Sequence, residues 1–123
     1  MRDYRKLQIW DIGREVAKEV YIITKEFPKD ELYGLTSQMR RAAVSIPSNI
    51  AEGCGRDSMK EFVQFLRISL GSVRELETQF YISSDIGYVD EMKFDLIMKK
   101  LDEASKKIWA YIKYLEGKKK LCF

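Results

Sequence analysis

The chain of 123 residues has the length of a single domain, and its 46% hydrophobic and 33% charged residues are the mixture expected of a globular helical protein. Its 22 basic and 19 acidic residues give a net charge of +3, which is too small to indicate a nucleic-acid partner by itself. Histidine is absent, which excludes Ser-His-Asp and Cys-His catalysis and removes the commonest metal ligand. We therefore expect no enzyme activity, and neither a metal nor a cofactor.

The two cysteines, Cys54 and Cys122, are too few for a structural zinc site in a chain without histidine, unless carboxylates supply ligands. Free thiols in a reducing compartment are the simplest interpretation. The first six residues are mostly polar, and the stretch Leu7–Trp10 is too short for a signal peptide or a membrane span. The sequence thus predicts a cytoplasmic protein that does not enter a membrane.

The first two predicted helices cover about residues 6–27 and 34–52. In each of them apolar residues recur at steps of three and four, which is the period of a helix with one buried face. Pro28 ends the first helix, because the residue before a proline is disfavoured in the helical region. Pro47 lies inside the second, where it removes the backbone hydrogen bond to the carbonyl of Ala43 and predicts a kink rather than a break.

The third predicted helix covers about residues 58–85 and has the clearest start signal. Ser58 and Glu61 fit a capping box, and Gly87 follows as a stop signal. Its apolar residues extend to a second side of the helix, and the residues on that flank are Phe65, Ile68 and Ile82. No helix is central in a four-helix bundle, so we expect another subunit to cover this flank.

The fourth predicted helix covers about residues 90–116, with Asp90 as its N-cap. A basic tail, residues 117–123, follows; its lysines could bind phosphate, although a solvated tail is the simpler interpretation. Four helices with short connections pack antiparallel to their neighbours. The sequence therefore predicts one all-α domain over residues 1–123, an up-down-up-down four-helix bundle that assembles into a homo-oligomer.

Basic residues recur at seven-residue steps along the third helix, which places them nearly on one face. Such a row could follow the phosphates of a nucleic-acid strand. The candidate contacts are Lys60, Arg67 and Arg74, with Arg56 just before the helix and Arg40 on the second helix. The alternative is a solvated helix face whose charges pair with nearby carboxylates, Glu75 and Glu77 among them.

Polar residues follow a lane along the second helix at steps of three and four, beside its apolar stripe. The residues of this lane are Gln38, Arg41, Ser45, Asn49 and Glu52. Their expected partners on the third helix are Glu75, Glu77 and Gln79. We favour a buried network that fixes helix register or a subunit interface, in which every donor needs an acceptor. The alternative is a surface that contacts a ligand or RNA.

The segment between the second and third helices contains Cys54 between two glycines, Gly53 and Gly55, which are expected to end the second helix. A loop of this kind could form an anion-binding nest or expose a reactive thiol. The pattern lacks the Lys-Ser/Thr pair of a phosphate-binding loop. A plain turn between helices is the interpretation we favour.

The second and third helices carry specific sequence runs. Residues 45–53 read Ser-Ile-Pro-Ser-Asn-Ile-Ala-Glu-Gly, within a longer matching run from Tyr33, and residues 75–79 read Glu-Leu-Glu-Thr-Gln. The chain resembles the 23S rRNA-intervening sequence proteins over nearly its whole length. It departs from their pattern at Cys54, where another residue is often found, and this argues against a thiol-based function.

The resemblance implies a bacterial four-helix bundle that associates as a ring-like pentamer, in a family whose biochemical role is not established. The family is similar to the accessory protein of diversity-generating retroelements, a pentameric bundle that binds nucleic acid and a reverse transcriptase. A ring would multiply a weakly basic face through multivalency.

Our leading hypothesis is a non-enzymatic, oligomeric protein that binds RNA or DNA through its phosphates. We expect little base preference, because the basic row has no aromatic residues between its members. The alternative is a structural adaptor that recruits a protein partner and has no nucleic-acid role.

Overall fold

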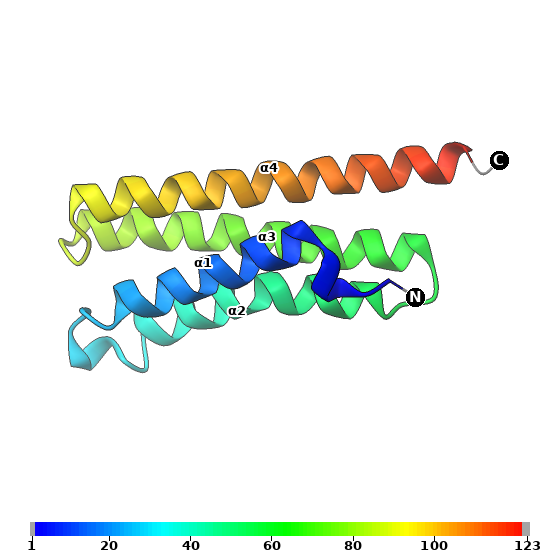
Figure 1. Ribbon diagram of the computed structural model, residues 1–123. Helices are drawn as coiled ribbons and strands as arrows, with labels where there is room; N and C mark the ends of the chain where they lie inside the picture. Colours follow the sequence, from blue (N-terminus) through cyan, green and yellow to red (C-terminus); the bar gives the residue numbers. More distant parts are fainter. Residues whose placement is uncertain (1, 122–123) are drawn as a thin grey trace.

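A computed structural model describes residues 2–121 as a bundle of four α-helices, without a strand in that range (Figure 1). This confirms the all-α class and the four expected helices. In chain order, the elements are the 3-10 helix η1 (Tyr4–Lys6), α1 (Gln8–Thr24), the 3-10 helix η2 (Lys29–Glu31), α2 (Leu35–Cys54), α3 (Met59–Asp85) and α4 (Glu91–Leu121). The last two residues of the expected basic tail, Cys122 and Phe123, lie outside the described residues.

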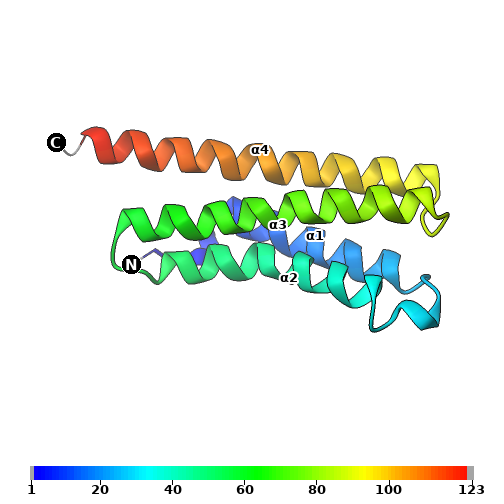
Figure 2. The same cartoon turned by 180° about the vertical axis from the view of Figure 1, so that it is seen from behind.

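Each helix lies beside its neighbours in the sequence, and α4 returns to contact α1 (Figures 1 and 2). Following the colours from blue to red shows that successive helices run in opposite directions along the bundle. The contact between α2 and α3 is the most extensive, and the contact between α1 and α4 is the smallest of the four. The side of the bundle formed by α1 and α4 is therefore the least tightly closed.

The first helix ends three residues before the predicted position, at Thr24 instead of Phe27. The chain tightens after Thr24, because the amides of Glu26 and Phe27 donate to carbonyls three residues earlier, those of Ile23 and Thr24. Phe27 is nevertheless buried, and its ring lies 5.2 Å from that of Tyr88, between centroids. The apolar pattern of the sequence extends beyond the end of the helix because Phe27, which follows it, is also part of the core.

The second helix continues through Pro47 and includes Gly53 and Cys54, so the prediction that Gly53 stops it is wrong. A Cβ on Gly53 would lie 2.8 Å from Phe62 Cδ1 and 2.8 Å from Phe65 Cβ. Gly53 is therefore required for the close approach of α2 to α3, whereas Gly55 is the C-cap residue.

The last two helices begin as expected. The Ser58 hydroxyl accepts the backbone amide of Glu61 at 3.1 Å, and Asp90 Oδ1 accepts the amide of Lys93 at 2.8 Å. The fourth helix continues to Leu121, five residues beyond the predicted end, so the start of the expected basic tail is helical. Lysine is a good helix former, and cations near a helix C-terminus interact favourably with its dipole.

The core contains the aliphatic and aromatic residues of all four inner faces. Its largest fully buried side chains include Phe62, Phe80, Met39, Leu101 and Ile108. Burial of an apolar side chain of this size contributes about 1.5–3 kcal/mol, so these contacts dominate the stability of the bundle. Within residues 2–121, none of the helices is both long enough and apolar enough to span a bilayer.

Candidate nucleic-acid interface

The basic row of α3 lies on the surface, where Lys60, Arg67 and Arg74 are all exposed. Two of its members form ion pairs with carboxylates in the structure. Arg67 Nη2 lies 3.1 Å from Glu116 Oε2 on α4, and Arg74 Nη1 lies 2.7 Å from Glu77 Oε1 on the same helix. Ion pairs at such exposed positions contribute about 0–1 kcal/mol, so the phosphates of a ligand can displace them.

The indole of Trp109 on α4 lies beside this row and adds an aromatic ring to its cations. Arg67 Cζ lies 5.7 Å from the ring centroid, and Lys113 Nζ lies 4.4 Å from it. The sequence shows no aromatic residue between the members of the row, but the structure adds one beside it, from the neighbouring helix. Trp109 belongs to a different helix, and only the packing of α4 against α3 brings it to Arg67.

Glu116 connects the two cations beside Trp109. Its Oε1 lies 3.4 Å from Lys113 Nζ, while its Oε2 pairs with Arg67. Desolvation by its surroundings opposes ionisation, but the hydrogen bonds and charges of Lys113 and Arg67 hold the pKa of Glu116 below its ordinary value. Arg67, Trp109, Lys113 and Glu116 form one cluster, which we call the Trp109 cluster.

The other two predicted phosphate contacts do not join this face. Arg40 lies between α1 and α2, where its Nε donates to Thr24 Oγ1 at 2.9 Å and its Cζ lies 4.7 Å from the Tyr21 ring centroid. Arg56 pairs with Glu52 at 2.9 Å, and its Cζ lies 4.7 Å from the ring centroid of Phe65.

Phe65 is two residues from Arg67 and thus about 200° around the helix. The five predicted cations therefore occupy three separate places on the bundle.

Part of the polar lane of α2 forms hydrogen bonds with α3. The hydroxyls of Ser45 and Ser72 lie 2.6 Å apart, and Asn49 Nδ2 donates to the Ser45 carbonyl at 2.8 Å and to its hydroxyl at 3.0 Å. On the same side of α3, the buried Ser69 hydroxyl donates to the carbonyl of Ile46 at 2.9 Å. The sequence analysis did not identify Ser69 and Ser72 as partners of α2.

The predicted partners Glu75, Glu77 and Gln79 do not bond to α2. The hydrogen bonds that the structure shows for them stay within α3, since Gln79 Nε2 donates to Glu75 Oε2 at 3.3 Å and Glu77 pairs with Arg74. Gln38 and Arg41 are exposed and line a shallow hollow with Glu75. The helical spacing of the polar residues did not reveal that serine side chains form the hydrogen bonds between α2 and α3.

Replacing Ser72 with alanine is expected to destabilise the protein by about 1 kcal/mol, because a mostly buried hydrogen bond is lost. The same change at Ser45 should lower the free energy of unfolding by a similar amount. In the double variant the two effects should not add, and denaturant unfolding of the four proteins measures this coupling. Simple additivity would show that the 2.6 Å contact contributes nothing to stability.

Cys54 is the last residue of α2 and is only 5% exposed, so the expected loop position is wrong. Desolvation by burial raises the pKa of its thiol above the ordinary value. A buried, protonated thiol is a poor nucleophile. The interpretation of this segment as a reactive-thiol loop is therefore contradicted.

Alkylation of Cys54 by iodoacetamide near pH 8 is expected to be at least about 10-fold slower in the folded protein than in the denatured chain, because only the exposed thiolate reacts. The Cys122→Ser variant isolates this thiol for mass spectrometry. Equal rates in the folded and denatured states would show that Cys54 is accessible.

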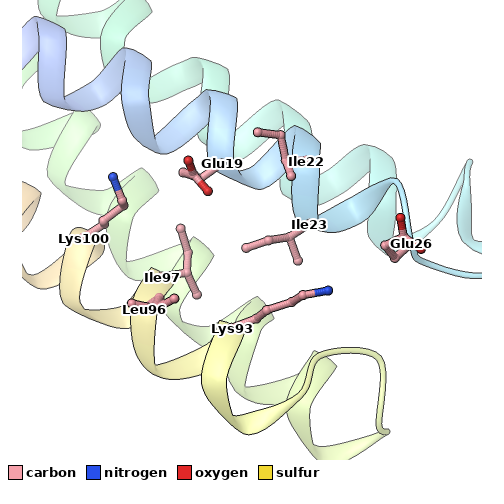
Figure 3. A pocket seen from close by; sticks show the side chains of 8 residues that line it. All are labelled: Glu19, Ile22, Ile23, Glu26, Lys93, Leu96, Ile97 and Lys100. Carbon is pink, nitrogen blue, oxygen red and sulfur yellow. The ribbon is translucent and has the colours of Figure 1, made fainter.

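A separate apolar hollow of about 210 Å³ opens between α1 and α4 (Figure 3). Ile22, Ile23, Leu96 and Ile97 form its floor and walls. Its rim carries opposite charges on its two sides: Glu19 on α1 and Glu26 just after that helix, and Lys93 and Lys100 on α4. Within the described residues no group of three or more Cys, Asp or Glu side chains is placed to hold a metal ion.

Fold and surface together define a small all-helical bundle protein with cationic and aromatic side chains on an outer face. Its sequence places it in a family: the chain belongs to the 23S rRNA-intervening sequence proteins, whose family model matches residues 5–110.

Its fold is also similar to the crystal structure of a protein of unknown function from the S23 ribosomal protein family of Bacteroides thetaiotaomicron. The TM-score is 0.77 at 23% sequence identity, over 85% of this chain and 95% of that one. No curated protein matches the chain significantly.

Proposed function

We propose that this chain is a non-enzymatic, homo-oligomeric protein of the cytoplasm that binds RNA or DNA through the phosphate backbone. The observation that carries the proposal is the α3–α4 face, on which Lys60, Arg67 and Arg74 lie in one row and Lys113 lies beside them. The name of the family, which refers to a sequence within 23S ribosomal RNA, agrees with a nucleic-acid partner.

Binding on this face would proceed by exchange of carboxylates for phosphates. In the free protein, Glu77 forms an ion pair with Arg74, and Glu116 forms one with Arg67. A phosphate chain brings more negative charge to the same guanidinium groups and releases condensed counterions, which makes the binding dependent on salt. The net charge of +3 is small, so one bundle would bind weakly.

Self-association would repeat the face and strengthen binding by avidity. The flank of α3 supports it, since Ile68 is 52% exposed and Ile82 is 45% exposed in the single chain. Exposed apolar groups that lie along one helix favour coverage by another subunit. The family resemblance makes a ring-like pentamer the expected assembly.

The test of this function is purification from the native cell at low salt, followed by sequencing of the RNA that co-purifies. Light scattering on the same sample should give about five times the 14.5 kDa of one chain. A monomer that retains no nucleic acid would contradict the proposal.

The alternative, a structural adaptor, is favoured by the hollow between α1 and α4 (Figure 3). Ile22 is 47% exposed and Leu96 is 59% exposed at its edge, and charged residues surround them. This arrangement suits a partner's amphipathic helix, with its apolar face over the isoleucines and leucine. An adaptor of this kind would retain no RNA at low salt, and Leu96→Glu would abolish its partner binding.

A further inference from the structure

Trp109 is a large exposed aromatic that the core does not explain. Its neighbour Ile108 is buried in the core, so the next position on α4 points away from it by about 100°. The indole is 44% exposed. The other tryptophan, Trp10, is half-buried against the core and has the Tyr4 ring 5.1 Å away, between centroids.

The surroundings of Trp109 are cationic. The structure places the ammonium of Lys113 at 4.4 Å and the guanidinium of Arg67 at 5.7 Å from the ring centroid. Both are exposed side chains that can move from the indole to a phosphate. An aromatic ring beside backbone-binding cations is the arrangement with which proteins bind single-stranded nucleic acids.

Gly71 leaves this part of α3 without a side chain. It is exposed, lies four residues after Arg67 and three before Arg74, and a Cβ placed there would meet nothing beyond its own stretch of the helix within 4 Å. Residues at these spacings share one helix face. No side chain of α3 therefore stands between the two arginines, and the surface there is open to a sugar or a base.

We propose that Trp109 stacks an unpaired base, so that the ligand of this face is a single-stranded segment of RNA or DNA. The inference rests on the proposed function, since Arg67, Arg74 and Lys113 would hold the phosphates on either side of that base. A duplex keeps its bases stacked on one another and cannot offer a free base face to the indole. It would bind through its phosphates alone.

The test uses the full-length protein and two labelled ligands, an unstructured strand of about 16 nucleotides and a duplex of the same length. Trp109→Leu should weaken binding of the single strand by about 10-fold, because stacking of one base contributes about 1–3 kcal/mol. Its affinity for the duplex should not change. Trp109→Phe keeps an aromatic face and should recover part of the loss.

Tryptophan fluorescence supplies a second readout. Trp10→Phe leaves Trp109 as the sole tryptophan, and the single strand should then quench its emission whereas the duplex should not. Circular dichroism checks that each variant keeps the helical content of the parent.

The two proposals fail differently. If the parent binds the single strand and the duplex equally and Trp109→Leu changes neither, nucleic-acid binding stands and the stacking inference is overturned. If the parent binds neither ligand at low salt, the proposed function itself is overturned.

Discussion

Gly53→Leu is expected to destabilise the protein by about 2 kcal/mol, because the new side chain has no space between α2 and α3. Even its Cβ would lie 2.8 Å from Phe62 Cδ1 and from Phe65 Cβ. Phe62 is buried in the core and cannot move aside. Overpacking of this kind costs about 3 kcal/mol, and the better helix propensity of leucine offsets only about 1 kcal/mol.

Denaturant unfolding measures this change as a lower midpoint at an unchanged slope. Gly71→Ala is the control for helix propensity, because Gly71 also lies inside a helix but its Cβ would meet nothing beyond its own stretch of that helix within 4 Å. It should stabilise the protein by about 0.5–1 kcal/mol. If both variants were stabilised, α2 and α3 would not approach each other as closely as the structure shows.

The combined change of Lys60, Arg67 and Arg74 to alanine should weaken binding of single-stranded RNA by about 100-fold near physiological salt. Each lost phosphate contact removes the release of roughly 0.7 counterions from a single strand, and the loss grows as salt is lowered. The slope of log affinity against log salt should become about 2 units less steep. Fluorescence anisotropy over a series of salt concentrations measures both quantities.

A charge-matched control separates the site from a general effect of charge. Lys18, Lys25 and Lys29 are exposed and lie on α1 and on the segment before α2. Their combined change to alanine lowers the net charge from +3 to zero, as the first triple variant does. The control should lose only a few-fold in affinity. Equal losses in the two variants would show that the α3 row is not the binding site.

The helices could be predicted from the sequence because their signals are local. Apolar residues at three- and four-residue steps, the cap at Ser58 and the proline at position 28 depend only on neighbours along the chain. The ends were less accurate where packing decided them. Phe27 continued the apolar pattern after the helix had ended, and Gly53 was required by two phenylalanines of another helix.

The candidate site was harder to predict, since its parts come from different helices. The row on α3 was found by its spacing, but Trp109, Lys113 and Glu116 reach it from α4. Their sequence separation from Arg67 exceeds 40 residues, and no periodicity within one helix reveals it. Arg40 shows the converse: the sequence analysis grouped it with the row, and the structure places it apart from the row, against Tyr21 of α1.

The central claim is that the α3–α4 face binds nucleic acid through its phosphates. The most direct measurement is the affinity of the full-length protein for an unstructured RNA between about 50 and 200 mM salt. We predict a linear decrease of log affinity with log salt, steep in the parent and shallower in the Lys60, Arg67 and Arg74 variant. Absence of binding at the lowest salt, or an affinity that salt does not change, would contradict the claim.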